Sequence, residues 1–285
     1  MFIQKKALYI VATPIGNLGD MTFRAIQILN GVDIIAAEDT RHSRTLLSYY
    51  HITTPIFSLH NYNEQKKIKT ILDCLNQGKS VALISDAGTP LISDPGYHLT
   101  IKAIENKYHV IPIPGVSALI ASLSVAGLPT DRFCFEGFLS AKSNVRKKQL
   151  TALVTETRTM IFYEAPHRII VSLKAMMTVF GPQRQATIAR ELTKKFEQII
   201  HATLGELLAQ CQNHAIPIKG EFVILIRGNS EKKSDSNQEK QIKTILTVLM
   251  NEVSLKKAVE LTQHMTGQTR SKIYALALKM KKEVS

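Results

Sequence analysis

The sequence contains few cysteines and lacks common metal-site patterns. Its three cysteines, Cys74, Cys134 and Cys211, lie far apart in a chain of 285 residues. An odd number at such distances excludes a disulfide scaffold and a CxxC zinc site, and it fits a reducing cytoplasm. The nine histidines include no HExxH pair, which excludes a zincin site. We therefore expect a cytoplasmic protein without a metal centre.

The sequence also lacks a membrane segment. The apolar run Ala7–Ala12 follows Lys5 and Lys6 but is shorter than the ~7–15 residues of a signal peptide, so we expect a buried strand there. Residues 110–130 carry no charge, yet prolines and glycines interrupt them. Pro114-Gly115 is typical of a strand, a turn and a helix rather than of a membrane helix. We expect no membrane partner.

The composition is that of a globular protein with a strong basic excess. Hydrophobic residues make up 45% and charged residues 21% of the chain, which excludes disorder over most of it. The length suggests about two domains. The 36 Lys and Arg residues against 23 Asp and Glu give a net charge of +13. This excess indicates a polyanionic partner, and it favours nucleic acid over an anionic membrane.

Short apolar runs alternate with helical patterns as far as residue 227. This alternation predicts an α/β fold with a mainly parallel sheet. The runs expected as strands in the first half are Ala7–Ala12, Val32–Ala37, Ile56–Leu59, Ser80–Ile84 and His109–Ile113. Those expected in the second half lie near Phe133–Glu136, Thr159–Tyr163, Ala186–Arg190 and Phe222–Arg227. We place an N-terminal α/β domain in residues 1–115 and a second one in residues 116–228.

The C-terminal part differs in composition from the rest. Residues 229–240 are nearly devoid of apolar side chains and their charges cancel, so we expect a flexible linker. Residues 241–285 hold eight Lys or Arg and three Glu. Two expected helices, Leu255–His264 and Thr269–Met280, flank Gly267 in the outline of a basic helix-turn-helix. The alternative is a helical hairpin that packs on the core with a solvated basic face.

Four segments that follow strands carry residues suited to ligand binding, as expected at the carboxyl ends of strands in α/β sheets. They are residues 13–20, 38–44, 85–96 and 114–118. The first contains Gly16-x-x-Gly19 but not the full GxGxxG, so a plain turn explains it equally well. The second holds five ionisable groups directly after a buried strand. Such groups serve a site or pair among themselves.

The other two segments combine small residues with a carboxylate. Glycines and prolines shape the third and leave backbone groups available to a ligand. In this segment, Asp86 is placed to accept hydrogen bonds from a ribose or an amine. The alternative is that Asp86 or Asp94 caps a turn of the backbone. The fourth segment lets a ligand approach a helix N-terminus.

In this order and spacing, the segments resemble the tetrapyrrole-methylase superfamily and, within it, bacterial ribosomal small-subunit RNA (cytidine-2′-O-)-methyltransferases. The resemblance covers nearly the whole chain. It rests on Ala12–Leu18, Ala37–Arg41, Ser85–Pro90, Pro114–Ala118, Tyr163–Arg168, Ala189–Lys194 and Lys219–Val223. Many superfamily members begin with V-G-x-G-P-G, where this chain has Ala12–Asn17. This departure fits the RNA branch.

The resemblance implies two α/β domains with S-adenosylmethionine in the cleft between them, and a homodimer. It implies that the substrate is 16S ribosomal RNA within the 30S subunit. The residues expected to contact the cofactor are Pro14, Asp86, Ala87, Gly88, Thr89, Ser117, Ala118, Tyr163 and Gly220. The residues expected to contact RNA are Arg44, Lys256, Lys257, Arg270, Lys272 and Lys279.

A ribose 2′-hydroxyl is a weak acid, so its methylation benefits from a proton acceptor or from a cation that stabilises the alkoxide. The candidate acceptors are Glu38, Asp39 and Glu191. The candidate cations are Arg41, Arg190 and Lys194. Each is alternatively half of a buried ion pair, and for Arg190 and Glu191 the two interpretations are equally weighted.

Two other functions compete with RNA methylation. A tetrapyrrole (precorrin or uroporphyrinogen) C-methyltransferase would share the cofactor loops but has no need of a basic helical tail. A nucleic-acid-binding regulator with a vestigial α/β body would explain the tail, but the intact cleft segments argue against it.

Overall fold

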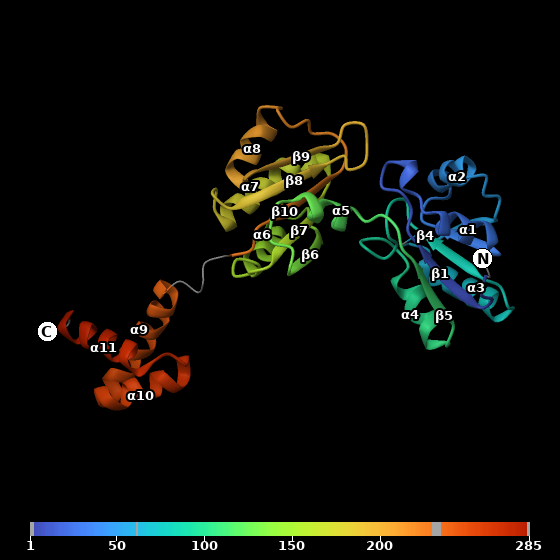
Figure 1. Cartoon of the computed structure of the whole chain (residues 1–285). Coiled ribbons are helices and arrows are strands. Elements are labelled where there is room, and N and C mark those ends of the chain that lie inside the picture. The colour runs from blue at the N-terminus through green and yellow to red at the C-terminus, as the bar shows by residue number, and fades with distance from the viewer. Residues whose placement is uncertain (1–2, 61, 230–234, 284–285) are drawn as a thin grey trace. The chain divides into compact units, whose positions relative to one another are not determined.

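The computed structural model describes residues 3–60, 62–229 and 235–283 (Figure 1). The chain divides into two compact units, residues 1–228 and residues 229–285.

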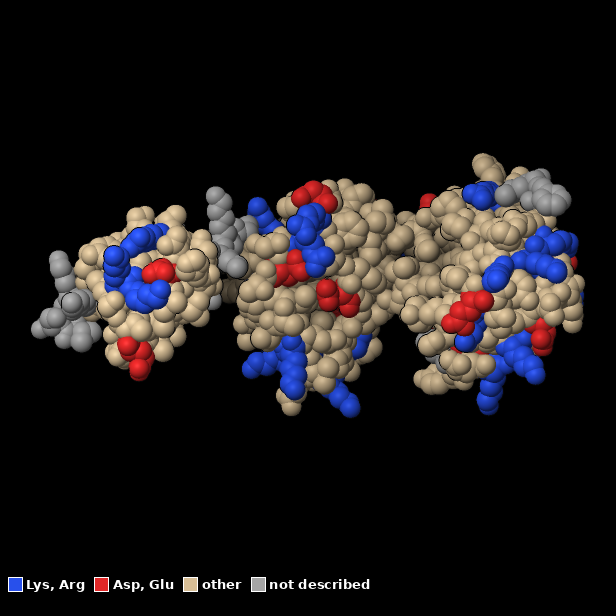
Figure 2. All heavy atoms as spheres, turned by 90° about the horizontal axis from the view of Figure 1, so that it is seen from below, with Lys and Arg blue, Asp and Glu red and all other residues tan. Residues whose placement is uncertain are grey.

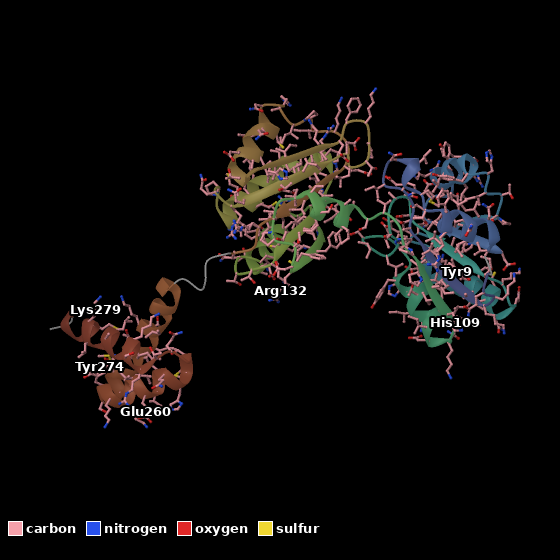
Figure 3. The ribbon with its side chains drawn as sticks, viewed as in Figure 1. Tyr9, His109, Arg132, Glu260, Tyr274 and Lys279 are labelled. Carbon is pink, nitrogen blue, oxygen red and sulfur yellow. The ribbon has the colours of Figure 1, made fainter. Side chains whose placement is uncertain are left out.

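The first sheet is fully parallel, as predicted, with the strand order β3-β2-β4-β1-β5. Its strands are β1 (Ala7–Val11), β2 (Ile34–Ala37), β3 (Ile56–Ser58), β4 (Val81–Ile84) and β5 (His109–Ile113). Central strands such as β4 are apolar throughout because helices cover both faces of a parallel sheet. The side chain of Tyr9 on β1 is buried, and its hydroxyl accepts a hydrogen bond from the Gln4 N–H at 2.8 Å (Figure 3).

Four helices follow the strands of this sheet: α1 (Phe23–Gly31), α2 (Thr40–Tyr49), α3 (Glu64–Asn76) and α4 (Tyr97–Glu105). The helices α1 and α2 contribute to one core cluster, and α3 and α4 contribute to the other. The two clusters lie on opposite faces because neighbouring strand residues alternate between them. Residues 40–44, expected as a loop, are instead the first turns of α2. Asp39 explains this difference, since its carboxylate caps the helix by accepting the Arg41 N–H at 2.8 Å.

The second sheet has the order β6-β7-β10-β8-β9. Its strands are β6 (Phe133–Phe138), β7 (Thr159–Glu164), β8 (Gln185–Arg190), β9 (Gln198–Thr203) and β10 (Phe222–Ile226). Only β6 and β7 pair in parallel, and the other three pairings are antiparallel. The prediction of a mainly parallel sheet is therefore wrong for this half. The strand β9 was not expected, and the short connection 191–197 between β8 and β9 allows only an antiparallel pair.

Helices cover both faces of the second sheet as well. The helices α6 (Ser143–Ala152), α7 (Ile169–Phe180) and α8 (Leu204–Gln212) share one core cluster with the sheet. The helix α5 (Ala118–Val125) packs on the other face, in a cluster that also contains Ile15 from the first half. Single 3₁₀ turns occur at Leu18–Asp20 and at Pro166–Arg168.

The C-terminal unit is a three-helix module of α9 (Asp235–Glu252), α10 (Leu255–Thr266) and α11 (Arg270–Glu283). It buries its own core, which contains Ile242, Leu246, Ala258, Val259, Ile273, Leu276 and Ala277. The two helices around Gly267 are confirmed, and Gly267 ends α10 in the left-handed conformation at φ +65°. The linker predicted for residues 229–240 is too long, because α9 already begins at Asp235, where helix-favouring Gln, Glu and Lys follow. Residues 230–234 lie outside the described residues.

Within the described residues, no helix is both long and apolar enough to cross a membrane.

Candidate functional site

Two cavities lie where the strands of the first sheet end. The larger has a volume of about 330 Å³ and takes its walls from both halves of residues 1–228. Its lining residues are Ile15, Ala87, Gly88, Thr89, Ile92, Ser93, Asp94, Ser117, Ala118, Phe138, Tyr163, Glu164, Ala165, Pro166, Glu221, Phe222 and Val223. This lining includes three acidic side chains and no basic one. A ligand that carries positive charge suits such a cavity.

The smaller cavity has a volume of about 180 Å³. It is lined by Pro14, Gly16, Leu18, His42, Ser43, Thr45, Leu46, Ser85 and Asp86. The two cavities share a wall that consists of two chain segments, residues 13–16 and residues 85–89. Ile15 and Ala87–Thr89 line the larger cavity, whereas their immediate neighbours in sequence line the smaller one.

Backbone hydrogen bonds hold the two wall segments together. The Thr13 N–H donates to the Gly88 carbonyl at 2.9 Å, and the Gly88 N–H donates to the Thr13 carbonyl at 3.0 Å. Gly88 has φ +78°, and a Cβ at this position would lie 3.3 Å from Cγ2 of Ile15. Glycine is therefore required by the backbone conformation and by the close approach of the two segments.

The second half contributes the N-terminus of α5 to the larger cavity. Ser117 is the N-cap residue, but its side chain makes no capping hydrogen bond. Instead, the Tyr163 hydroxyl accepts the Leu119 N–H at 3.1 Å. Burial raises the pKa of Tyr163, so the phenol stays neutral. Its ring packs edge-on against Phe135 and Phe138, with centroid distances of 4.8 and 5.7 Å.

A buried ion pair lies beside Tyr163. The Glu164 carboxylate is 1% exposed and pairs with the Arg168 guanidinium at 2.9 Å. It also accepts the Ala165 N–H at 2.8 Å and the Ser172 hydroxyl at 2.5 Å. These contacts explain the acidic and basic residues of the segment Tyr163–Arg168, since they fix the wall of the cavity where β7 ends.

Three carboxylates gather near the shared wall. Burial, assisted by the nearby charge of Asp86, raises the pKa of Asp94 to about 6, although a hydrogen bond with Ser85 opposes the rise. Burial also raises the pKa of Glu38 to about 6, assisted by the charges of Asp94 and Asp86. The Asp39 N–H donates to Oδ1 of Asp86 at 3.0 Å. Asp94 was predicted only as a possible turn cap, and its position in the cavity depends on a loop whose path the sequence does not reveal.

The remaining candidates for catalysis differ in position. Hydrogen bonds from the backbone of Arg41 and from its side chain lower the pKa of Asp39, which weakens it as a proton acceptor. The Arg41 side chain is 88% exposed and lies 3.7 Å from the Asp39 carboxylate. Neither residue lines either cavity. Arg44 is also exposed on α2.

Arg190 and Glu191 do not form the ion pair that was considered. The Arg190 guanidinium donates to the Lys219 carbonyl at 2.8 Å and to the Gln198 side chain at 3.0 Å. The Glu191 carboxylate pairs with Lys194 at 2.8 Å. Burial opposes its ionisation, yet this ion pair and the Glu221 N–H outweigh burial, so the pKa of Glu191 is lowered. Both residues tie loops together outside the two cavities.

The residues expected to contact the cofactor fall into three groups. Six line the larger cavity: Ala87, Gly88, Thr89, Ser117, Ala118 and Tyr163. Pro14 and Asp86 line the smaller cavity instead. Gly220 lines neither cavity. Its φ of +85° and the Glu191 carboxylate, which occupies the place of a Cβ, require glycine next to Glu221. Glu164, Glu221 and Phe222 belong to quoted motifs, and Phe138 has no sequence signal.

The basic residues expected to contact RNA lie on the surface of the C-terminal unit. Lys256, Lys257, Arg270 and Lys279 are exposed, and Lys272 is partly exposed. Lys257 pairs with Glu260 at 3.0 Å. Figure 2 shows Lys and Arg side chains gathered on the visible face of this unit, and Figure 3 labels Lys279 on α11.

Comparisons with known proteins agree with this arrangement. The family model described as "Tetrapyrrole (Corrin/Porphyrin) Methylases" matches residues 7–208, and the model described as "RsmI C-terminal HTH domain" matches residues 236–281. The chain is 48% identical to a protein named ribosomal RNA small subunit methyltransferase I from Escherichia coli O157:H7, over 95% of this chain and 94% of that protein. It is 47% identical to the protein of the same name from Vibrio cholerae, again over 95% of this chain and 94% of that protein.

A solved structure shows the same fold. Uroporphyrin-III C-methyl transferase from Thermus thermophilus, complexed with S-adenyl homocysteine, matches with a TM-score of 0.55 at 15% identity. The match covers 78% of this chain and 97% of that chain. The predicted fold class, two α/β halves of this type and a helical C-terminal module, is therefore confirmed. The chain belongs to the tetrapyrrole methylase family and, within it, to the ribosomal RNA small subunit methyltransferases I.

Proposed function

We propose that this protein transfers a methyl group from S-adenosylmethionine to the ribose 2′-oxygen of a cytidine in 16S ribosomal RNA, with the 30S subunit as substrate. The observation that carries the proposal is identity of 48% over 95% of the chain with a small-subunit ribosomal RNA methyltransferase. This match includes both sheets and the C-terminal module. Solved tetrapyrrole methylases share only the fold, at 13–17% identity, so tetrapyrrole C-methylation is not favoured.

The larger cavity fits the cofactor. S-adenosylmethionine carries a sulfonium and an ammonium group, and it supplies the methyl group when bound. Asp94, Glu164 and Glu221 are the charged groups of the lining, and Glu164 and Glu221 are already paired with Arg168 and Lys194. Asp94 has no such partner among the ion pairs of the described residues. The wall segment Ala87–Thr89 and the N-terminus of α5 provide the backbone groups that hold the cofactor's polar atoms.

Methyl transfer from a sulfonium requires mainly that the nucleophile be held in line with the donor. We infer that Asp94 accepts the proton of the 2′-hydroxyl, because it lines the larger cavity and has a pKa of about 6. A base with a pKa near the working pH is ionised yet still able to take a proton. Glu38 is the second candidate, since it lies in the same cluster of carboxylates. Asp39, Arg41, Arg190 and Glu191 act as positioning residues in this proposal.

The C-terminal unit serves as a docking module for RNA in this proposal. Its exposed lysines and arginines contact phosphates, which orients the substrate without reading its sequence. A homodimer, a cytoplasmic location and the division of residues 1–228 at residue 115 also belong to the proposal, and they rest on the resemblance and on the sequence pattern.

The direct test is incubation of the protein with labelled S-adenosylmethionine and 30S subunits from a strain without the modification. We expect label on a single cytidine ribose, located by nuclease digestion and mass spectrometry. Naked RNA and a porphyrinogen are parallel substrates. Label on the porphyrinogen alone, or no label on any substrate, would refute the proposal.

A further inference from the structure

The smaller cavity has no role in the proposed function. It lies beside the larger cavity and shares a wall with it, but Asp86 and Pro14, which were expected at the cofactor, line this second space. Its volume of about 180 Å³ is little more than half the roughly 330 Å³ of the larger cavity. A single planar ring suits this space better than a complete nucleoside.

The walls combine apolar surface with polar side chains, among them Ser43 and Asp86. Pro14, Leu18 and Leu46 offer apolar contacts of the kind that cover the faces of a nucleobase, and His42 adds an aromatic ring. Ser43 is only 2% exposed, although it lines the cavity. No hydrogen bond to its hydroxyl is found among the described residues. The Ser43 hydroxyl is therefore available to hydrogen-bond with a ligand in the cavity.

Asp86 is held so that one oxygen remains available. Its Oδ1 accepts the Asp39 N–H at 3.0 Å, which fixes the orientation of the carboxylate. No second hydrogen bond to this carboxylate is found in the described part of the chain. An ionised carboxylate accepts hydrogen bonds but donates none, so it selects a ligand with an amine over one with a carbonyl at the same place.

We propose that the smaller cavity binds the base of the target nucleotide and that Asp86 recognises its exocyclic amine. This inference rests on the proposed function, and it assigns the choice of cytosine over uracil to one side chain. The amine of cytosine donates to Asp86, whereas the O4 atom of uracil would face the carboxylate and be repelled. The Ser43 hydroxyl meets the O2 or N3 edge. A base held here leaves its ribose at the shared wall, next to the methyl donor.

The decisive variant is Asp86→Asn. Its amide oxygen still accepts the Asp39 N–H, so the amide NH₂ takes the place of the available carboxylate oxygen. This group donates to O4 of uracil and no longer accepts from cytosine. We expect the variant to lose turnover on cytidine and gain turnover on uridine, which shifts the ratio of the two by about 10- to 100-fold, the range of a base-specific hydrogen bond.

The experiment uses the full chain and reconstituted 30S subunits that carry cytidine or uridine at the position methylated by the wild-type protein. The Michaelis constant for S-adenosylmethionine is measured with each subunit. The matched control is Asp73→Asn, a change of the same kind at an exposed position outside both cavities. We expect the control to leave the cytidine-to-uridine ratio unchanged and Asp86→Asn to leave the Michaelis constant for the cofactor nearly unchanged.

Three outcomes would overturn the inference. An unchanged ratio in a folded Asp86→Asn variant is the first. A loss of cofactor affinity at an unchanged ratio is the second, and it would assign Asp86 to the donor site. If Asp86→Asn does not fold, Ser43→Ala tests the inference instead, because loss of the Ser43 hydroxyl should lower turnover on both subunits about 5- to 10-fold. Full turnover of Ser43→Ala is the third outcome. Absence of methylation by the wild-type protein would instead refute the proposed function itself.

Discussion

Replacement of Arg168 by Met should destabilise residues 1–228 more than replacement of its partner Glu164 by Gln. The reason is an asymmetry in burial, because the Glu164 carboxylate is 1% exposed and the Arg168 side chain is 24% exposed. Arg168→Met leaves a buried negative charge without its counter-ion. Glu164→Gln leaves a positive charge that still reaches water.

The magnitude follows from the contacts that remain. Loss of one partner from a buried ion pair costs about 3–5 kcal/mol, but Glu164 keeps the hydrogen bonds from Ser172 and Ala165. We therefore expect about 2–3 kcal/mol for Arg168→Met and about 1 kcal/mol for Glu164→Gln. A folded unit of 228 residues has an unfolding entropy of about 0.5 kcal/mol/K near its midpoint. The corresponding decreases in melting temperature are about 4–6 °C and about 2 °C.

Near-ultraviolet circular dichroism of tyrosine is the suitable assay. All tyrosines except Tyr274 lie in residues 1–228, so the signal reports that unit rather than the C-terminal helices. The double variant Glu164→Gln/Arg168→Met should recover part of the loss, because no uncompensated charge stays buried. Equal losses in the two single variants, or a larger loss for Glu164→Gln, would refute the argument from burial.

Three further predictions concern the cavities and the C-terminal unit. Burial raises the folded-state pKa values of Asp94 and Glu38 to about 6, so the free energy of unfolding should fall as the pH rises from about 4 to about 6, and a variant with Asp94→Asn and Glu38→Gln should show a flatter pH profile in urea unfolding. Turnover of the wild type should fall below about pH 6. Asp94→Asn should lose this pH dependence of turnover, because Asp94 is the proton acceptor in the proposed function. Gly220→Ala should weaken cofactor affinity in calorimetry, because its Cβ would clash with the Glu191 carboxylate, which accepts the Glu221 N–H and so positions Glu221 and Phe222. Gly78→Ala serves as the control, because Gly78 has the same φ of +85° and a Cβ there meets nothing within 4 Å. Deletion of residues 229–285 should raise the Michaelis constant for 30S subunits and flatten its salt dependence without changing cofactor affinity; full activity with an unchanged salt slope would contradict the docking role.

The parts of the fold that the sequence predicts are those with a local cause. The buried strands of the first sheet are continuous apolar runs, and Thr22 and Gly78 mark the start of α1 and the end of α3. The strand β9 has no such signal, because its residues are only half buried and the preceding turn contains neither glycine nor proline. That turn instead places Glu191 and Thr193 at positive φ values of 51° and 65°. Tertiary packing determines this hairpin, so local propensity misses it.

The site shows the same division between local and tertiary causes. Motifs identify the segments around the cavities correctly, but they do not indicate which side of a segment a residue faces. Asp86 and Ala87 are neighbours in sequence, yet they line different cavities. Arg190 and Glu191 are neighbours at the end of β8 and bind different partners. A motif therefore does not predict which cavity a residue lines when one chain segment forms the wall between two cavities.

The distribution of charge connects the fold to the two ligands of the proposed function. The chain as a whole carries +13, yet the lining of the larger cavity contains acidic side chains and no basic ones. A uniformly basic surface would attract RNA phosphates into the cavity and repel a cationic methyl donor. In the proposed function, basic residues on the exterior attract the polyanion and carboxylates at the strand ends attract the cation. Burial, assisted by the charges of neighbouring carboxylates, raises the pKa values of Asp94 and Glu38 to about 6. In that proposal, the geometry that admits the cation also creates groups able to accept a proton near neutral pH.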